Sequence, residues 1–300
     1  MNFQIPYQVK ANIFAYPSYG YATSQFEYFR IGIALFSLFN FILFLLDYDV
    51  LLAYNGMINW EVTNANSFWF EPHLQKFTNF ISPTLLLNTL SFTYILSLSL
   101  LALGYKTGIT SILSFSCFLL FSFQLYPYLY GVDLYQSVLL FLLCIFPSGY
   151  SKSLFQKKIN PTTNSVQQIA VRAIQIYLMI TYFSAGIGKV QMPSWLNGEF
   201  LFLSISDPTY QLIPFPNYFG ASFFAISGCI VVFMELFYPV LIFIPIIRSL
   251  LLIGIIGMHA FIVLFMGLVP FGTLLIIINL IAWYPLFRKD LITIFQNKKS

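Results

Sequence analysis

Long apolar segments separated by short polar stretches run through almost the whole chain. A helix needs roughly 20 apolar residues to cross the hydrocarbon core of a bilayer. Eight segments reach or approach that length, at residues 29–46, 84–105, 109–126, 132–146, 169–187, 221–245, 249–268 and 271–286. An open strand would leave its backbone groups unpaired in lipid, and the alternating pattern of a β-barrel is absent. The pattern therefore predicts an all-α, polytopic transmembrane helical bundle of about eight spans.

Two of the connections between these segments are long. Residues 51–83 and 189–220 carry Trp, Tyr, Asn and Pro, and aromatic residues with a polar edge concentrate at the membrane–water interface. We expect short interfacial helices in both loops, on the outer side of the membrane. The sequence predicts a single transmembrane domain over residues 1–300, with a core at about 28–288 and cytoplasmic tails at 1–27 and 289–300.

The composition agrees with a lipid environment. The chain is 59% hydrophobic and only 8% charged, whereas soluble domains carry about 25% charged residues. Membrane lipid is therefore the expected partner, and nucleic acid is not. The cysteines Cys117, Cys144 and Cys229 lie inside apolar runs, so we expect them to act as small hydrophobic residues, and no Cys/His spacing indicates a metal site.

The distribution of positive charge predicts the orientation. With eight spans, all Lys and Arg residues except Lys76 and Lys189 fall on one side of the membrane, and that side is cytoplasmic by the positive-inside rule. The N-terminal residues lack the apolar core of a signal peptide, so the first apolar segment is expected to direct insertion. We predict a multi-pass protein of the cell membrane with cytoplasmic N- and C-termini.

A polar stripe runs along the fifth apolar segment. Gln175, Tyr182 and Lys189 are spaced seven residues apart, which brings each back to within about 20° of the same helix face. Small residues at 185, 186 and 188 allow close approach of a neighbouring backbone. Lys189 either reaches the outer interface with its ammonium group or is a desolvated lysine that acts as a base.

The sixth and seventh segments carry further ionisable residues. Glu235 and His259 both lie roughly 13–18 Å from the inner end of adjacent antiparallel helices, at about 1.5 Å per residue. They are expected to pair, either to hold the helix register or as part of a proton relay or ligand site. Arg248 begins the seventh segment and lies on nearly the same helix face as His259. We expect it to be an anchor at the inner membrane interface or a supporting residue of the site.

Several short motifs resemble one known family. The run Tyr-Phe-Ser-Ala-Gly-Ile-Gly-Lys at 182–189 is followed by Trp-Leu-Asn-Gly at 195–198, and Glu235, Arg248, His259 and Phe271 follow at spacings of thirteen, eleven and twelve. Tyr-Leu-Tyr-Gly at 128–131 adds a further match. This pattern is similar to the horizontally transferred transmembrane (HTTM) domain family, the membrane domain of vitamin K-dependent γ-glutamyl carboxylase, and in particular to its stand-alone bacterial members.

The resemblance implies a base at Lys189, a quinone or vitamin K-like hydroquinone cofactor, and a place in the bacterial inner membrane. Two positions depart from the carboxylase pattern: Gly188-Lys189 replaces consecutive lysines, and Tyr126 stands where the carboxylase has an active-site histidine. The carboxylase also carries a large extracytoplasmic C-terminal region for its peptide, and this sequence ends shortly after the last apolar segment. We therefore expect carboxylase-like or lyase-like chemistry other than authentic γ-glutamyl carboxylation.

Two functions follow as hypotheses, and a small-solute transporter ranks below both. The first is quinone-linked or lipid-linked chemistry, or peptide modification, at the outer half of the bilayer. Lys189 is its base or ligand group, Tyr182 and Trp195 shape the pocket, and Glu235, His259, Arg248 and Tyr126 are supporting residues. The alternative is a non-enzymatic membrane partner in the maturation or export of a secreted peptide, which depends on the two long loops more than on Lys189.

Overall fold

The computed structural model describes residues 21–51, 83–125, 129–154, 161–216 and 218–297. Within these ranges the regular secondary structure is helical and contains no strand. Helices predominate because a chain in lipid satisfies its backbone groups most simply within each helix. The predicted all-α class is confirmed.

The chain forms two compact units, which we describe separately. One comprises Phe26–Ala170, and the other comprises Met1–Gln25 together with Val171–Ser300. Helices α2 (Tyr21–Leu46) and α9 (Pro161–Val190) contain the boundaries between them. The expectation of a single transmembrane domain stays a prediction.

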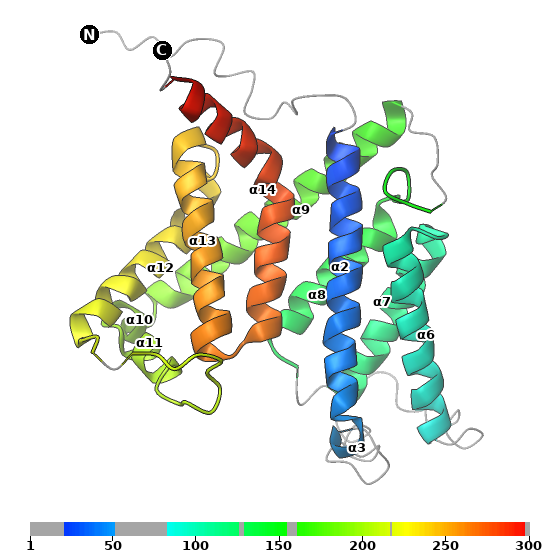
Figure 1. The fold of residues 1–300 in the computed structure, drawn as a ribbon, viewed down its shortest axis with the longest axis horizontal. Coiled ribbons are helices and arrows are strands. Elements are labelled where there is room, and N and C mark those ends of the chain that lie inside the picture. Colours follow the sequence, from blue (N-terminus) through cyan, green and yellow to red (C-terminus); the bar gives the residue numbers. More distant parts are fainter. Residues whose placement is uncertain (1–20, 52–82, 126–128, 155–160, 217, 298–300) are drawn as a thin grey trace. The chain divides into compact units, whose positions relative to one another are not determined.

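In the described part of the unit Phe26–Ala170, most of α2 is followed by α3 (Tyr48–Leu51), α6 (Pro83–Leu103), α7 (Thr107–Gln124), α8 (Gly131–Ile145) and the first part of α9 (Figure 1). Consecutive helices pack against one another in this unit: α6 packs on α7, and α7 packs on α8. At the start of α8, the Asp133 carboxylate accepts a hydrogen bond of 3.0 Å from the Tyr130 N–H and so caps the helix.

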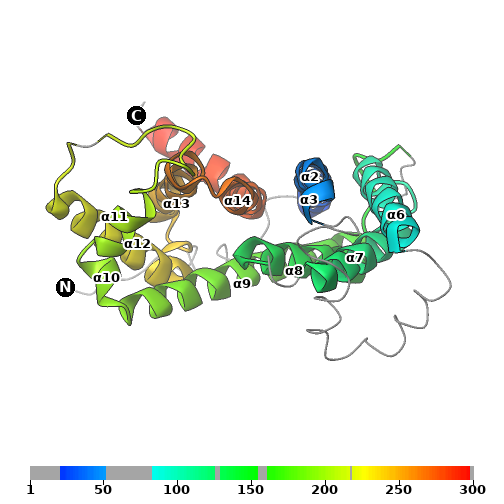
Figure 2. The same ribbon diagram turned by 90° about the horizontal axis from the view of Figure 1, so that it is seen from below.

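The unit that contains Val171–Ser300 is built from most of α9 and five later helices: α10 (Pro193–Leu196), α11 (Glu199–Ser204), α12 (Ala221–Leu241), α13 (Pro245–Met266) and α14 (Val269–Asn297). Helices α13 and α14 lie side by side in both views (Figures 1 and 2) and are joined by a tight turn. Gly267 makes this turn possible because its φ of 67° is left-handed and the Tyr210 backbone lies against it.

Each of the eight predicted segments is a helix, and six of these helices are long and apolar enough to cross a membrane. Helices α7 and α8 are apolar but shorter. The fold is that of a multi-pass α-helical membrane protein, whereas the count of eight spans stays a prediction. The six long candidates are Ser24–Leu46, Thr84–Leu103, Thr163–Val190, Ala221–Leu241, Ile247–Met266 and Val269–Asp290.

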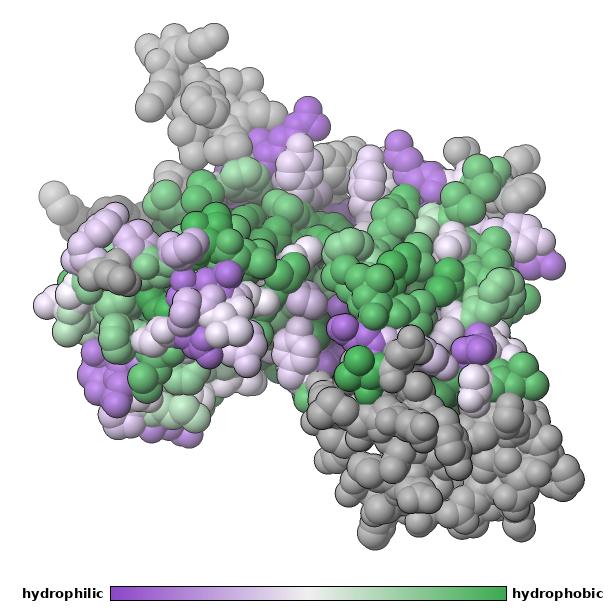
Figure 3. All heavy atoms as spheres, turned by 60° about the horizontal axis from the view of Figure 1, so that its bottom comes forward, coloured by the Kyte–Doolittle hydropathy of each residue, from purple (hydrophilic) through white to green (hydrophobic). Residues whose placement is uncertain are grey.

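The outer surfaces of the helices are apolar, as Figure 3 shows by the hydrophobic residues on their sides. On α9, for example, one exposed stripe contains Ile176, Ile180, Phe183 and Ile187, and Ile180 is 60% exposed. Exposed apolar stripes of this length are unfavourable in water and favourable against lipid chains. The surface therefore supports the membrane assignment independently of helix length.

The second long loop is folded. Helices α10 and α11 pack on α12, and Leu201, Ile205 and Phe224 form a small core there. The N–H groups of Leu212 and Ile213 both donate to the Leu264 carbonyl on α13, at 3.0 and 3.1 Å. Short helices are thus present in this loop as predicted, and most of the first loop, residues 52–82, lies outside the described residues.

One turn of the same loop is held by a carboxylate. The Asp207 carboxylate accepts hydrogen bonds from the Thr209 side chain and backbone N–H, and these bonds lower the pKa of Asp207 below its usual value. The loop is therefore ordered by its own polar contacts as well as by its apolar core.

A buried charge cluster holds together the unit Phe26–Ala170. Glu27 and Arg30 are 0% exposed and form an ion pair of 2.9 Å. The Glu27 carboxylate also accepts hydrogen bonds from the N–H groups of Gly149 and Tyr150, at 2.7 and 3.0 Å. The Arg30 guanidinium donates to the carbonyls of Leu101, Ala102 and Lys152. The pair therefore joins α2 to the end of α6 and to the segment after α8.

Replacement of either charge in this cluster is predicted to destabilise the protein. Glu27→Ala would leave Arg30 buried without its counter-ion, at a cost of about 3–5 kcal/mol. The apparent melting temperature in detergent should fall well below that of the wild type. Arg288→Ala is the matched control because Arg288 is exposed, and it should leave the melting temperature nearly unchanged. Equal melting temperatures for Glu27→Ala and Arg288→Ala would show that the cluster does not hold the fold.

Candidate functional site

Helices α9 and α12 cross at a glycine. A Cβ atom placed on Gly186 would lie 2.6 Å from the Leu236 nitrogen and 3.1 Å from the Glu235 carbonyl carbon. Only a residue without a side chain permits that approach. Gly188, by contrast, has no atom within 4 Å of such a Cβ. Of the small residues that predicted close packing on α9, Gly186 is therefore the one that brings α12 against this helix.

The crossing places the two charged residues in contact. Lys189 lies one turn beyond Gly186, and its Nζ atom is 2.5 Å from the Oε2 atom of Glu235 on α12. The Lys189 side chain is 18% exposed and that of Glu235 is 6% exposed. Charges are rare in membrane spans because desolvation is costly, and a pair reduces that cost. Lys189 is therefore held by a carboxylate on the buried face of α12 and is still partly exposed.

An aromatic residue completes this contact. The Lys189 Nζ atom lies 4.8 Å from the ring centroid of Trp195 on α10, within the range of a cation–π interaction. Trp195 stacks on Phe200, with ring centroids 4.3 Å apart. Helix α10 can approach α12 because Gly228 lies directly against the Trp195 carbonyl oxygen. The structure thus brings Lys189, Glu235 and Trp195 together, as three of the predicted site residues.

A second polar group lies in the interior of the same unit. The Tyr182 hydroxyl and the His259 Nε2 atom are 2.9 Å apart, and Asn279 on α14 donates from Nδ2 to the Tyr182 oxygen at 2.6 Å. The Tyr238 hydroxyl donates to Asn279 Oδ1 at 2.8 Å. All four side chains are at most 2% exposed. These residues form a buried network, which we call the Tyr182 network.

The partners of Glu235 and His259 differ from the expected pair. Among the described residues Glu235 pairs with Lys189, and His259 pairs with Tyr182. The estimate of depth along the helices was compatible with a Glu235–His259 contact, but the close crossing of α9 and α12 puts Lys189 nearer to the carboxylate. Asn279 and Tyr238 were missed. A buried asparagine in an apolar helix is the signal that could have found the network.

The polar stripe of α9 continues inward to a proline break in α14. Gln175 donates to the Ala282 carbonyl at 2.8 Å, and Gln25 donates to the carbonyls of Ile281 and Ala282 at 2.6 and 3.0 Å. Pro285 has no N–H for the Ile281 carbonyl. Gln25 thus supplies the hydrogen bond that the helix cannot give to the Ile281 carbonyl. The predicted stripe faces the protein interior and is structural at this end.

Two further predicted residues lie elsewhere. Arg248 forms a bidentate ion pair with Asp290, in which both hydrogen bonds are 2.8 Å long, and this pair joins α13 to α14. This contact fits the expected structural anchor, and its partner Asp290 was not predicted. Tyr126 lies outside the described residues.

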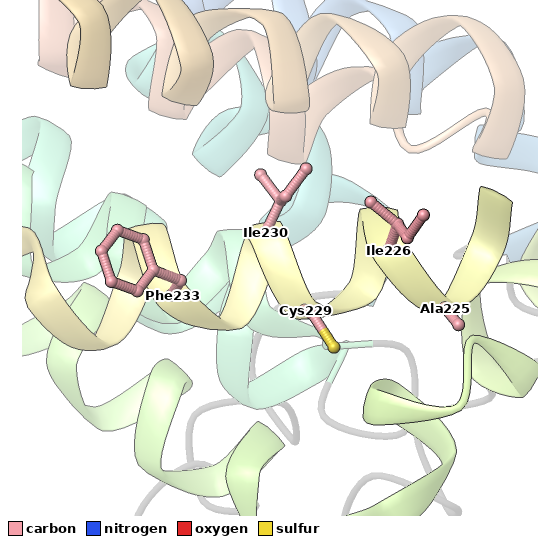
Figure 4. Close-up of a pocket in the computed structure, with 5 residues that line it drawn as sticks. All are labelled: Ala225, Ile226, Cys229, Ile230 and Phe233. Carbon is pink, nitrogen blue, oxygen red and sulfur yellow. The ribbon is translucent and has the colours of Figure 1, made fainter. Parts of the chain in front are cut away.

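A shallow, open surface cavity of about 370 Å³ lies on α12 and is lined by apolar side chains that are mostly exposed (Figure 4). Its lining residues are Ala225, Ile226, Cys229, Ile230 and Phe233. The buried face of α12 contains Val232, Glu235 and Tyr238 instead, so the cavity faces away from the ion pair. In the described residues no three His, Cys, Asp or Glu side chains come together as metal ligands would.

The fold and this site define the class of protein as a multi-pass helical membrane protein with a buried polar interior that contains a Lys–Glu ion pair. No protein-family model, curated protein or solved structure matches the chain. The resemblance to the HTTM family therefore stays a prediction that rests on the motifs in the sequence.

A substitution at the helix crossing tests the geometry of the ion pair. Gly186→Ala would place its methyl group against the Leu236 backbone and push α9 and α12 apart, at a cost of about 1–3 kcal/mol. Thermal unfolding in detergent measures this effect. Gly188→Ala is the matched control, since its methyl group meets open space and alanine favours the helix, so its melting temperature should equal or exceed that of the wild type. Equal effects of the two substitutions would contradict the crossing at Gly186.

Proposed function

We propose that this protein carries out quinone-linked or lipid-linked chemistry in the outer half of the cell membrane, with Lys189 as the acting group. In this proposal all eight apolar helices cross the bilayer, both termini are cytoplasmic, and the loop that contains α10 and α11 faces outward. The acting group then lies where a lipid-borne ligand and an external substrate can meet. The chemistry is carboxylase-like in the sense of the family resemblance.

The observation that carries the proposal is the Lys189–Glu235 pair with Trp195 beside it. A lysine that only reached the interface would extend toward lipid headgroups. Lys189 instead bonds to a carboxylate on the buried face of α12, inside the candidate membrane span of α9. Replacement of such a pair by apolar residues often costs little stability. Its presence between α9 and α12, in which Glu235 is the one charged residue, therefore favours a role in function.

The pair also sets a condition on the chemistry. A lysine accepts a proton only as a neutral amine, and the Lys189 Nζ atom lies 2.5 Å from the Glu235 carboxylate. Before Lys189 can act as a base, the ammonium proton has to pass to Glu235 Oε2, with loss of an N–H bond and formation of an O–H bond. Alternatively, Lys189 stays charged and binds an electron-rich oxygen of the ligand.

A quinone fits the groups present. The Lys189 ammonium can donate to a quinone oxygen, and the face of Trp195 can stack on a flat ring. A hydroquinone, when bound, supplies two electrons and two protons. The residues of this chain would bind and orient the ring, and Lys189 with Glu235 would hold or move one of the released protons.

Loss of Lys189 is the direct test of this proposal. The purified protein in lipid nanodiscs is incubated with the hydroquinone of a short-chain menaquinone, oxygen and bicarbonate, and hydroquinone consumption is measured by chromatography. Lys189→Ala should reduce the protein-dependent rate by about 10²–10⁴-fold, as expected for removal of a base. A Lys189→Met/Glu235→Met variant avoids an unpaired Glu235 and shows by thermal unfolding that the loss is chemical. Full activity of Lys189→Ala would exclude Lys189 as the base.

The alternative function is a non-enzymatic partner in the maturation or export of a secreted peptide. The observation that favours it is the apolar surface of the folded loop, where Leu203 is 61% exposed and Tyr210 is 68% exposed. In this case Lys189→Ala retains peptide maturation, whereas Leu203→Ser with Tyr210→Ser abolishes it. A small secreted peptide encoded next to this gene would favour this function, and a quinone or redox operon would favour the first.

A further inference from the structure

The Tyr182 network contains a buried nitrogen with no bonding partner. His259 is 2% exposed, and its Nδ1 atom has no hydrogen-bond partner in the described part of the chain. Its other ring nitrogen, Nε2, contacts the Tyr182 hydroxyl. A buried polar atom without a partner costs about 1–3 kcal/mol, so its presence calls for an explanation.

The direction of the hydrogen bonds can be worked out from Asn279. Its Nδ2 atom lies 2.8 Å from the Leu275 carbonyl oxygen, which can only accept. The amide is therefore oriented with Nδ2 as the donor to both Leu275 and Tyr182, and with Oδ1 as the acceptor from Tyr238. This orientation makes the Tyr182 oxygen an acceptor toward Asn279.

The Tyr182 hydroxyl has one proton to donate. The Asn279 bond occupies one lone pair of the Tyr182 oxygen and so favours donation of this proton to the His259 Nε2 atom, 2.9 Å away. Burial disfavours a charged ring, so the imidazole is neutral and carries its own proton on the other nitrogen. We infer that His259 presents an Nδ1–H group that binds a carbonyl oxygen of a ligand within the membrane.

The surroundings favour a neutral, flat ligand group. The His259 ring lies edge-on to Phe271, with centroids 5.9 Å apart, and at the same distance from the Tyr182 ring. An N–H donor in an aromatic setting suits a carbonyl of a quinone or of a lipid ester. The choice of a quinone rests on the proposed function, whereas the position of the proton on His259 does not.

The test uses the fact that the chain has only two histidines, His73 and His259. A His73→Gln variant labelled with ¹⁵N-histidine is placed in nanodiscs of ether-linked lipids, which have no ester carbonyl, and its ring nitrogens are observed by NMR. The expected spectrum shows a protonated Nδ1 and an unprotonated Nε2. Asn279→Leu removes the bond that directs the Tyr182 proton, so the Nε2–H form should appear alongside the first.

Ligand binding is then followed at the same nitrogen. A short-chain menaquinone should shift the Nδ1 resonance in ether-lipid nanodiscs, and His259→Phe should weaken menaquinone binding about tenfold, as expected for loss of one hydrogen bond. If ester-linked lipids shift the resonance without menaquinone, the lipid is the source of the carbonyl, and the inferred Nδ1–H donor stands. An Nε2–H form in the wild-type network, or an Nδ1 resonance that neither menaquinone nor ester lipid shifts, would overturn the inference.

The proposed function can fail separately from this inference. The Lys189→Met/Glu235→Met variant should retain the Nδ1–H signal, because His259 bonds to Tyr182 and the Lys189–Glu235 pair is a separate contact. An Nδ1 response without any hydroquinone consumption would reject the proposed redox chemistry and leave the assigned donor intact.

Discussion

The cost of placing charge in hydrocarbon constrains the whole structure. Three cations, two of them buried and one partly buried, lie against carboxylates: Arg30 against Glu27, Arg248 against Asp290 and Lys189 against Glu235. Two of these pairs are closed, since both partners are at most 8% exposed. The Lys189 pair differs because the lysine keeps 18% of its surface exposed and lies beside an indole ring. This difference distinguishes the Lys189–Glu235 pair, which is a candidate functional site, from the Glu27–Arg30 and Arg248–Asp290 pairs, which hold helices together.

The same constraint explains why uncharged polar residues gather inside the unit that contains Val171–Ser300. Gln25 donates to the Ile281 carbonyl that Pro285 leaves without an N–H partner, and Asn279 joins two tyrosines and a histidine in one network. Polar groups buried in the hydrocarbon have no water to bond with, so their hydrogen bonds must be made within the protein. The one ring nitrogen of His259 left without a partner is therefore as informative as the bonds around it.

Hydrophobic length and spacing were sufficient to predict the helices, the folded second loop and the inward face of α9. They were sufficient to select Lys189, Glu235 and His259, to which the family resemblance added Trp195, yet not to pair them correctly. Pairing depends on how closely two helices cross, and Gly186 controls that distance through an absent side chain. Asp290 and Asn279 were missed because their partners are distant in sequence or are backbone groups, which periodicity does not reveal. Glu27 lies three residues from Arg30, a spacing that sequence reasoning could have used, whereas its backbone partners at Gly149 and Tyr150 could not have been predicted.

The central claim is that Lys189 and Glu235 form one coupled pair inside the membrane part of the protein. A double-mutant cycle measures this coupling most directly, with the free energy of unfolding in detergent determined for the wild type, Lys189→Met, Glu235→Met and the double variant. The account predicts a favourable coupling energy of about 1–3 kcal/mol, with the double variant more stable than the sum of the single losses would allow. Additive losses, with a coupling energy near zero, would contradict it.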